Sequence, residues 1–548
     1  MSKISKVVKT ENWIKKNKPV VNFMGGISYK LNPLDTLKMI SASSIFGEPQ
    51  YYRESGVRDG KYKNPRIDLI SDSLVFDIPQ GASASKVMIS AIWEALDYDF
   101  EGVLSWAMEL RTDYNMRLNP QIIMVLAAIH PKRKEFTKEH KGAFSDVNYS
   151  VMHRADEPAT QLAFYLYYNK DKSKLPSILK RSWAQKLQNL TRYEMAKYKN
   201  HEVGMINTIR LCHANSPLID ELMQNGNISI DDKEKTWENL KSEGKTWKEI
   251  LDITYVPHMA LLRNLRNIFT ELISEDKELA KKVLETLKSG VLKGKQFPFR
   301  YYQAYKIIHG AEKISFKSDI LDTLEECIDI SLANMPKLKG KTACLSDNSG
   351  SAWGTLTSEY GTMQLAKINN LSAVLTCMNS EDGAVYKFGD NLKEYPITKR
   401  DGALSQADKI SSERGHDVGL GTEHGIWLFF KEAIEKNIFY DNIFIYSDMQ
   451  AGHAGLFGKG RNYVVDSTDF AFAQCYIDVN KLIKHYRNKV NPKVNVFCIQ
   501  TAGYNNILIP EYIYRGAYLY GWTGKESLFA NKLIEQWDIM EVKNDSNK

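Results

Sequence analysis

Hydrophobic residues in the first 335 positions recur every three or four residues, which is the spacing of amphipathic helices. The stretches with this spacing are Ser85–Leu96, Gly102–Leu110, Asn119–Ile129, Pro158–Tyr168, Leu175–Leu190, Met205–Leu211, His258–Ile273, Glu278–Leu287, Pro298–Ile308 and Ser318–Leu332. Proline stands at or near the start of several of them, which suits the first turn of a helix. The pattern therefore predicts an all-helical first domain. A stack of helical hairpins that curves into a solenoid and a single irregular bundle both fit it.

The pattern changes after Lys341, where short runs typical of strands alternate with helical stretches. The strand-like runs are Thr342–Leu345, Ala384–Phe388, Asn442–Tyr446, Val494–Ile499 and Ile513–Tyr520, and the helical stretches are Thr362–Met378, Gly425–Lys436, Asn480–Val490 and Glu526–Trp537. This alternation predicts a parallel sheet with helices on both faces. The segment Asn334–Lys341 has the proline, glycine and lysines of a linker. We therefore predict a helical domain at residues 1–335 and an α/β domain at residues 336–548.

Composition excludes several classes of protein. Of the 548 residues, 43% are hydrophobic and 25% are charged, which is ordinary for a folded protein and excludes a disordered or collagen-like chain. The longest apolar run, Ile122–Ile129, is far shorter than the roughly 18 residues of a transmembrane helix. The basic N-terminus lacks the apolar stretch of a signal peptide. Six scattered cysteines without a CxxC pair fit neither a zinc site nor a disulfide framework. We therefore expect a cytoplasmic protein.

Positive charge is concentrated in one segment of the helical half. The whole chain has a net charge of +7, and residues 169–200 alone hold nine basic residues against two acidic ones. The basic residues are Lys170, Lys172, Lys174, Lys180, Arg181, Lys186, Arg192, Lys197 and Lys199. Trp183, Tyr193 and Tyr198 are interleaved with them. Such a concentration predicts an anionic partner, although most lysine runs are simply solvated helix faces.

The α/β half contains a motif with the ligands that a hard cation prefers. Asp347, Ser349 and Ser351 alternate in the sequence DNSGS directly after the first predicted strand. Thr422 precedes a predicted helix, and Asp448 follows the strand Asn442–Tyr446. Ligands bind at the carboxyl ends of strands in open α/β sheets, and Mg²⁺ prefers oxygen ligands. The three segments predict a site for Mg²⁺ or another divalent cation, unless these residues only cap helices and turns.

Together these segments resemble the metal-ion-dependent adhesion site (MIDAS) of von Willebrand factor A (vWA) domains, which have a Rossmann-like fold. The resemblance implies that Ser349, Ser351 and Thr422 bind the metal directly, and that Asp347 and Asp448 bind it mostly through water. The open coordination position would accept an acidic side chain of a partner. Trp353 departs from the family pattern because a smaller apolar residue is usual there. Ser411 and Ser412 are alternatives to Thr422.

The helical half has a resemblance of its own. The stretches that carry it are Asn22–Gly26, Arg53–Gly56, Lys197–Asn200 (KYKN), Arg210–Pro217 (RLCHANSP) and Phe297–Tyr305 (FPFRYYQAY). They resemble signature stretches of the TROVE module, the ring of HEAT-like helical repeats in the Ro autoantigen family. A TROVE module followed by a vWA domain covers nearly the entire chain in the order seen here. The sequence is thereby similar to a bacterial- or phage-type Ro protein.

This resemblance implies a ribonucleoprotein component that acts in RNA quality control or decay. Ro proteins bind small noncoding Y RNAs on the outside of the ring, and single-stranded 3′ ends of misfolded RNAs enter its hole. In bacteria a partner is a 3′ exonuclease such as polynucleotide phosphorylase. We expect a monomer that binds no membrane. The candidate RNA contacts are Lys180, Arg181, Lys186, Arg192, Lys197, Lys199, Arg210 and His213, with a second basic group at Lys293, Lys295 and Arg300.

Sequence signals for catalysis are poor. The segment Gly452–Gly460 has the wrong glycine spacing for a phosphate-binding loop, and His201–Met205 lacks the second histidine of a zincin helix. We therefore expect a non-enzymatic RNA-binding protein. The alternatives are a protein–protein adhesion scaffold that acts through the α/β domain and a metal-dependent hydrolase of nucleic acid that uses Asp347 and Asp448.

Overall fold

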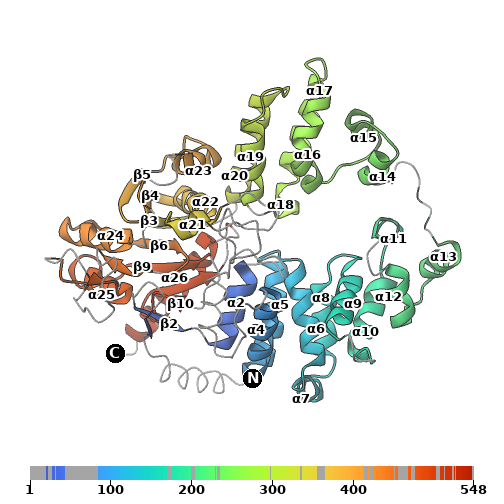
Figure 1. Cartoon of the computed structure of the whole chain (residues 1–548), viewed down its shortest axis with the longest axis horizontal. Coiled ribbons are helices and arrows are strands. Elements are labelled where there is room, and N and C mark those ends of the chain that lie inside the picture. The colour runs from blue at the N-terminus through green and yellow to red at the C-terminus, as the bar shows by residue number, and fades with distance from the viewer. Residues whose placement is uncertain are drawn as a thin grey trace, which may run out of the picture. The chain divides into compact units, whose positions relative to one another are not determined.

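The structure is a computed structural model, shown in Figure 1. It describes residues 20–21, 27–30, 32–43, 84–169, 174–198, 204–226, 228, 230, 235–296, 298–333, 336–354, 364–412, 417–419, 424–449, 451–454, 467–470, 475–501, 506–510, 513–520, 524 and 526–545. The chain divides into two compact units. The helical unit comprises Met88–Gly290 and Ala311–Lys317, and the sheet unit comprises Met1–Val87, Val291–Gly310 and Ser318–Lys548.

The helical unit consists of short helices joined by short connections. They are α4 (Ala84–Tyr98, which begins in the sheet unit), α5 (Phe100–Thr112), α6 (Leu118–Ile129), α7 (Arg133–Glu139), α8 (Ala143–Val151), α9 (Glu157–Tyr168), α10 (Ser177–Gln188), α11 (Arg192–Tyr198), α12 (Met205–Cys212), α13 (Pro217–Asn225), α14 (Trp237–Ser242), α15 (Trp247–Ile253), α16 (His258–Glu271) and α17 (Lys277–Ser289). Capping residues fix several ends. The Ser216 hydroxyl accepts a hydrogen bond from the N–H of Ile219 before α13, and Gly226, at a φ of 66°, ends that helix.

The predicted helices of this unit are confirmed. The apolar run Ile122–Ile129 belongs to α6, whose residues 122 to 128 are all buried. A buried polar centre ties four helices together at Gln161 of α9. Its side chain donates to Gln121 of α6 at 2.7 Å and to Asn148 of α8 at 2.8 Å, and accepts from the indole of Trp183 of α10 at 2.6 Å. Because every partner is satisfied, this centre can be buried without a large desolvation cost.

The sheet unit is built on a six-stranded sheet in the order β11-β9-β6-β3-β4-β5. The strands are β3 (Leu338–Asp347), β4 (Ser380–Phe388), β5 (Leu392–Pro396), β6 (Asn442–Ser447), β9 (Asn495–Gln500) and β11 (Gly516–Tyr520). All neighbours are parallel except β4 and β5. The five predicted strands and their parallel arrangement are confirmed. The antiparallel edge strand β5 was not predicted.

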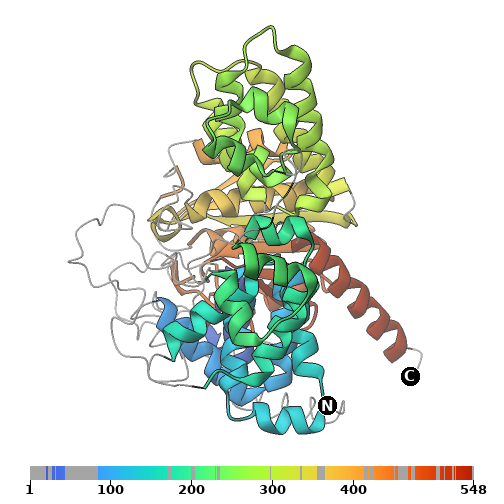
Figure 2. The same ribbon diagram turned by 90° about the vertical axis from the view of Figure 1, so that its right-hand side faces the viewer.

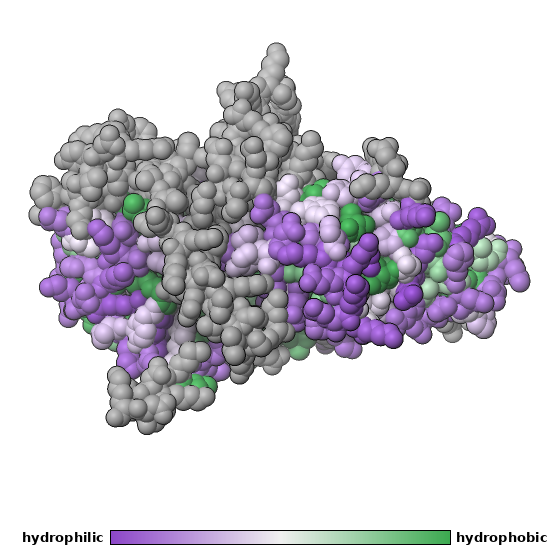
Figure 3. Space-filling model, turned by 90° about the horizontal axis from the view of Figure 1, so that it is seen from below, coloured by the Kyte–Doolittle hydropathy of each residue, from purple (hydrophilic) through white to green (hydrophobic). Residues whose placement is uncertain are grey.

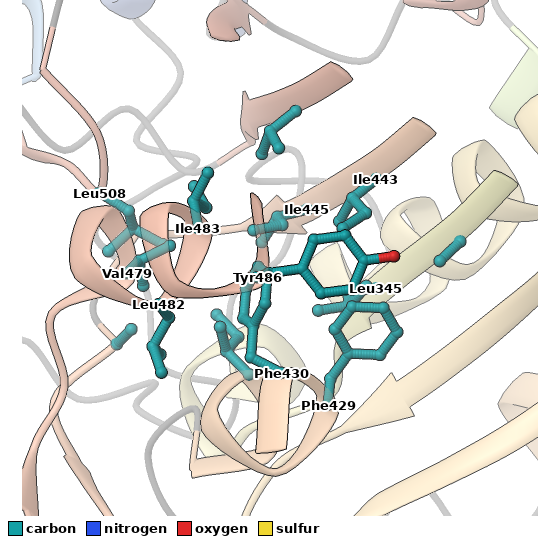
Figure 4. Close-up of a cluster of buried hydrophobic side chains, with 14 of the residues drawn as sticks. Leu345, Phe429, Phe430, Ile443, Ile445, Val479, Leu482, Ile483, Tyr486 and Leu508 are labelled. Atoms are coloured by element: carbon teal, nitrogen blue, oxygen red, sulfur yellow. The ribbon is translucent and has the colours of Figure 1, made fainter. Parts of the chain in front are cut away.

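Helices cover both faces of this sheet, as the alternation of strands and helices predicts. Helices α24 (His424–Glu435) and α25 (Val479–Lys489) pack on one face, where Leu345, Ile443 and Ile445 meet Phe430 and Tyr486 in the core (Figure 4). Helices α22 (Leu365–Met378) and α26 (Glu526–Asp545) lie on the other face. Figure 2 shows α26 as a long red helix. The indole of its Trp537 stacks on Phe497 of β9 at 5.6 Å.

Further elements complete the sheet unit. They are β1 (Val20–Val21), β2 (Ile27–Lys30), α2 (Pro33–Ser43), α18 (Val291–Gly294), α19 (Pro298–His309), α20 (Lys317–Ala333), α21 (Gly350–Gly354), α23 (Ala403–Ser412), β7 (His453–Ala454), β8 (Cys475–Tyr476) and β10 (Asn506–Ile507). Strand β2 pairs with both β1 and β10, so residues near the N-terminus join the α/β half of the chain. None of the described helices is both long and apolar enough to span a membrane.

The structure corrects the predicted linker at Asn334–Lys341. Residues from Leu338 onward belong to β3, and Leu338 is fully buried, with its N–H donating to the carbonyl of Asn379 at 2.9 Å. The segment resembles a linker because β3 is irregular here: its register against β4 shifts between Leu338 and Lys341, and Gly340 has a φ of 76°. Most of the helices α18 to α20 also cluster with the sheet, so the compact units do not coincide with the predicted domains.

Candidate functional site

The sheet brings two of the predicted metal-binding segments to one place. Strands β3 and β6 are neighbours at the centre of the sheet, and the chain continues from β3 to one side and from β6 to the other. This is the switch point at which open α/β sheets bind ligands outside the carboxyl ends of their strands. Asp347 is the last residue of β3, and Asp448 directly follows β6.

The hydroxyls and carboxylates of this site contact one another. The Ser349 N–H donates to Asp347 Oδ1 at 2.8 Å, the hydroxyls of Ser349 and Ser351 are 3.0 Å apart, and the Ser351 hydroxyl donates to Asp448 Oδ2 at 2.7 Å. Asp347 is fully buried, and Asp448 is 2% exposed. Four of the five predicted metal-site residues thus form one cluster, which we call the hydroxyl–carboxylate cluster. The fifth, Thr422, lies outside the described residues.

Close contacts hold the described residues that precede and follow Thr422 in the chain. Before it, the carbonyl of Val418 accepts from the N–H of Asn391 at 2.8 Å, and Asp417 Oδ1 lies 2.5 Å from the ammonium of the fully buried Lys387. After it, Gly425 approaches β4 so closely that a Cβ there would lie 2.4 Å from Cβ of Phe388. Only glycine fits this position without a shift of the neighbouring chain.

The sequence analysis missed three buried asparagines next to the hydroxyl–carboxylate cluster. Asn348 lies within the DNSGS motif, and Asn369 and Asn370 come from α22. The Asn369 amide donates to the main-chain carbonyl of Asp347 at 3.1 Å. Their signal in the sequence was the adjacent pair of amides in an otherwise largely apolar helix. Among the described residues, no group of three or more His, Cys, Asp and Glu side chains is placed to hold a metal, so a cation here would depend on the serine hydroxyls.

Trp353, the departure from the family pattern, is a buried residue. It is 8% exposed and forms a small cluster with Ala352 and Ala366. The ammonium of Lys367 lies 6.0 Å from the centre of its ring. Its size is thus explained by packing between α21 and α22.

The predicted RNA contacts of the helical unit lie on α10, α11 and α12 and their ends. Arg181, Arg192, Arg210 and His213 are exposed, and Lys180, Lys186 and Lys197 are half-buried. Helices α10 and α12 pack together. Burial raises the pKa of the Cys212 thiol of α12, and the nearby charge of Lys180 of α10 opposes this rise, so basic residues of both helices share one region. We call these residues the α10–α12 basic surface. Lys199 lies outside the described residues.

Not every charge of this surface is equally available. Arg192 forms a two-pronged ion pair with Glu221 of α13, with bonds of 2.7 and 2.6 Å. The ammonium of Lys186 donates to the carbonyl of His153 at 3.3 Å, and that of Lys197 lies 5.6 Å from the centre of the Tyr193 ring. His213 ends α12 with a left-handed backbone, at a φ of 57°. Its backbone caps the helix while its side chain stays in solvent.

Trp183 of α10 lies among basic residues in the sequence, but its side chain belongs to the core and not to the basic surface. Trp183 is fully buried and bonded to Gln161, so it cannot stack on a base. Tyr193, in contrast, is 41% exposed. The second basic group, Lys293, Lys295 and Arg300, belongs to the sheet unit, and all three residues are exposed. The face in Figure 3 is largely hydrophilic where it is not grey, with hydrophobic residues in small separate groups.

Two comparisons with known proteins bear on the resemblance to the TROVE module and to Ro proteins. A family model of the TROVE domain matches residues 227–352. No curated protein sequence matches the chain. Among solved structures, the chain is similar to the crystal structure of the Ro (RSR) protein of Deinococcus radiodurans, with 14% sequence identity and a TM-score of 0.53 over 90% of this chain and 98% of that chain. The resemblance to bacterial Ro proteins is confirmed. The family match extends beyond residue 335 and includes the whole DNSGS motif, up to Ser351.

Proposed function

We propose that this chain is a non-catalytic RNA-binding protein that acts as Ro proteins do, in RNA quality control or decay. The observation that carries the proposal is the TROVE match on a chain whose fold is similar to that of a bacterial Ro protein over 90% of its length. The α10–α12 basic surface supports it independently, because lysine and arginine bind RNA phosphates without regard to sequence. In the proposed assembly, the helical repeats form a HEAT-like ring and the sheet unit is a vWA domain.

Two classes of RNA are proposed to bind. A small structured, Y-like RNA would contact the α10–α12 basic surface through its phosphates. A single-stranded 3′ end of a misfolded RNA would contact Lys293, Lys295 and Arg300 in the hole of the ring, since basic channels grip single strands. A 3′ exonuclease such as polynucleotide phosphorylase is the proposed protein partner. The protein would act as a cytoplasmic monomer.

The hydroxyl–carboxylate cluster is proposed to bind Mg²⁺ as a MIDAS. Its donors are all oxygen, which is what Mg²⁺ requires, and a Mg²⁺ ion usually keeps several waters. Asn369 Oδ1 is a buried acceptor that has no hydrogen-bond partner among the described residues, as expected where an ordered water binds. The residues thus fit a hydrated cation. Ser349 and Ser351 would hold it directly, Asp347 and Asp448 through water, and Thr422 would complete the set. The bound ion would supply an open position for a partner's carboxylate.

Binding of a structured RNA with a single-stranded 3′ tail tests the proposal, measured at two salt concentrations. The variant reverses the charges of Lys180, Arg181, Lys186 and Lys199. We expect affinity at low salt to fall at least about tenfold and the dependence of log K on log salt to become shallower by about 3 to 4, because each of the four lost phosphate contacts removes about 0.7 to 0.9 from that slope.

A matched control reverses four other lysines of the helical unit, Lys138, Lys141, Lys277 and Lys281, all of them exposed. We expect it to retain most of the affinity. Equal loss in both variants would show that only the total charge matters. No RNA binding by the wild-type protein at low salt would refute the proposal. Release of product from labelled RNA in Mg²⁺ would refute its non-catalytic part.

A second candidate is a protein–protein adhesion scaffold, which the hydroxyl–carboxylate cluster favours. In that case a protein partner would bind without RNA. The binding would be lost in chelator and in the Asp347→Ala variant.

A further inference from the structure

A pair of buried carboxamides braces the DNSGS segment, which supplies three of the four residues of the hydroxyl–carboxylate cluster. Asn348, within the DNSGS motif, and Asn370, on α22, are both fully buried. Each donates to the other: Asn348 Nδ2 to Asn370 Oδ1 at 2.8 Å, and Asn370 Nδ2 to Asn348 Oδ1 at 3.1 Å. Asn348 stands between Asp347 and Ser349, so its side chain fixes the loop from within.

Asn370 makes two more bonds, which use its remaining capacity. Its Oδ1 also accepts from the hydroxyl of Ser346 on β3 at 2.7 Å, and its Nδ2 donates to the hydroxyl of Ser411 on α23 at 3.0 Å. One side chain thus joins the strand, the loop and two helices. A buried polar group in this position favours a single arrangement of its neighbours, because any other arrangement leaves donors or acceptors unsatisfied.

Helix α23, which holds the far side of this brace, is itself anchored. Glu325 of α20 accepts from the N–H groups of Leu404 and Ser405 in the first turn of α23, both at 2.8 Å. A carboxylate at a helix N-terminus satisfies free N–H groups and complements the helix dipole. Tyr302 of α19 donates to Asp408 in the middle of α23 at 3.1 Å. The brace therefore rests on a fixed element.

We propose that Asn370 is a positioning residue for divalent-cation binding at the hydroxyl–carboxylate cluster. Through Asn348 it holds Asp347 and Ser349 in place, and Ser411 holds Asn370. The inference rests on the Mg²⁺ site proposed above. Residues that orient metal ligands without touching the metal typically contribute 10- to 100-fold to affinity.

The test is Mg²⁺ binding to the full chain, measured by calorimetry. We expect Asn370→Ala to weaken binding at least about tenfold, and Ser411→Ala to weaken it less, because Ser411→Ala removes only the outer support. The matched control is Asn379→Ala. Asn379 ends the same helix, is 3% exposed, and donates to the carbonyl of Pro336 and the hydroxyl of Ser527, both at 3.0 Å. Asn379 lies nine residues after Asn370, at the C-terminal end of α22. We therefore expect Asn379→Ala to lower the unfolding temperature, as Asn370→Ala does, but to leave the Mg²⁺ affinity unchanged.

The outcomes separate the inference from the site on which it rests. Unchanged affinity in Asn370→Ala, or equal loss in Asn379→Ala, would overturn the positioning role while the metal site stands. Absence of saturable Mg²⁺ binding by the wild-type protein, or binding that survives Ser351→Ala, would overturn the metal site and the inference together. If Asn370→Ala does not fold, Ser411→Ala decides: unchanged affinity there would contradict the brace.

Discussion

At the scale of single residues, the two faces of α10 lie in opposite environments. Leu179, Trp183 and Leu187 are buried, while Arg181 between them is exposed. The spacing of four residues between the three apolar side chains already marks the buried face. Trp183 is interleaved with basic residues in the sequence, although the helical period places it on the opposite side of α10 from Arg181. The exposed residues of a helix are thus predicted better from its period than from its composition.

The two faces give a prediction that separates stability from RNA binding. We expect Trp183→Ala to lower the free energy of unfolding by about 3–5 kcal/mol, the usual cost of truncating a buried aromatic residue. RNA affinity per folded molecule should not change. Arg181→Glu should weaken RNA binding and leave the free energy of unfolding nearly unchanged. Urea unfolding and RNA titration of both variants provide the measurement, and weaker RNA binding by folded Trp183→Ala would contradict the assignment.

At the scale of elements, long periodic helices and buried strands were predicted well, and short or non-local elements were not. Helices α14 and α15 have six and seven residues, which is too short for a periodic pattern. The signal that remained was the capping box of Thr246 and Glu249. Strand β2 pairs with β10 near the other end of the chain, and nothing local in either sequence specifies that partner.

The same limit applies to the candidate site. Asp347, Ser349, Ser351 and Asp448 were predictable, because parallel strands end at one edge of the sheet and these residues lie at or just after the ends of β3 and β6. The links from Asn370 to Asn348 and Ser411 were not, since they depend on how α22 and α23 pack on the sheet. Residues that hold a ligand can be found from the sequence of one loop, whereas the residues that support them depend on the tertiary fold.

Helix α26 is attached to the sheet by charges around Glu541. This carboxylate accepts from the hydroxyl of Tyr514 at 2.6 Å, from Arg515 at 2.8 Å and from Lys493 at 3.0 Å. Asp538 on the same helix also pairs with Arg515, at 2.6 Å. The hydrogen bond from Tyr514, with those from Lys493 and Arg515, lowers the pKa of Glu541 from 4.5 to about 2.

This pKa predicts how the attachment depends on pH. Because the pKa of Glu541 is lower in the folded state than in the unfolded chain, its contribution to stability is complete above about pH 4.5 and is lost as the pH falls towards about 2. We expect Glu541→Gln to be less stable than wild type at neutral pH, with a difference that shrinks across this range. Denaturant unfolding between pH 7 and pH 2 provides the measurement. A difference independent of pH would show that shape, and not charge, holds α26.

At the scale of the whole molecule, basic residues occur in both compact units. The α10–α12 basic surface belongs to the helical unit, whereas Lys293, Lys295 and Arg300 belong to the sheet unit. The boundary drawn from sequence composition put both groups in one domain. Composition could not show otherwise, because hydrophobic residues in α19 and α20 recur every three or four positions as they do in the helices before them, and only their contacts assign these helices to the sheet unit.

This division predicts that the two basic groups recognise different parts of one RNA. The gain in affinity from a single-stranded 3′ tail is the ratio of the dissociation constants without and with the tail. We expect charge reversal of Lys293, Lys295 and Arg300 to abolish this gain and to preserve binding of the structured part. Charge reversal on the α10–α12 basic surface should weaken the binding of both RNAs, with and without the tail, by the same factor. Both RNAs contain the structured part, whose phosphates are proposed to contact this surface, so the gain from the tail should stay intact. Titration of each variant with both RNAs measures the ratio. Loss of the gain in both variants would mean that one continuous surface binds the whole RNA, and its persistence in both would place the tail on neither group.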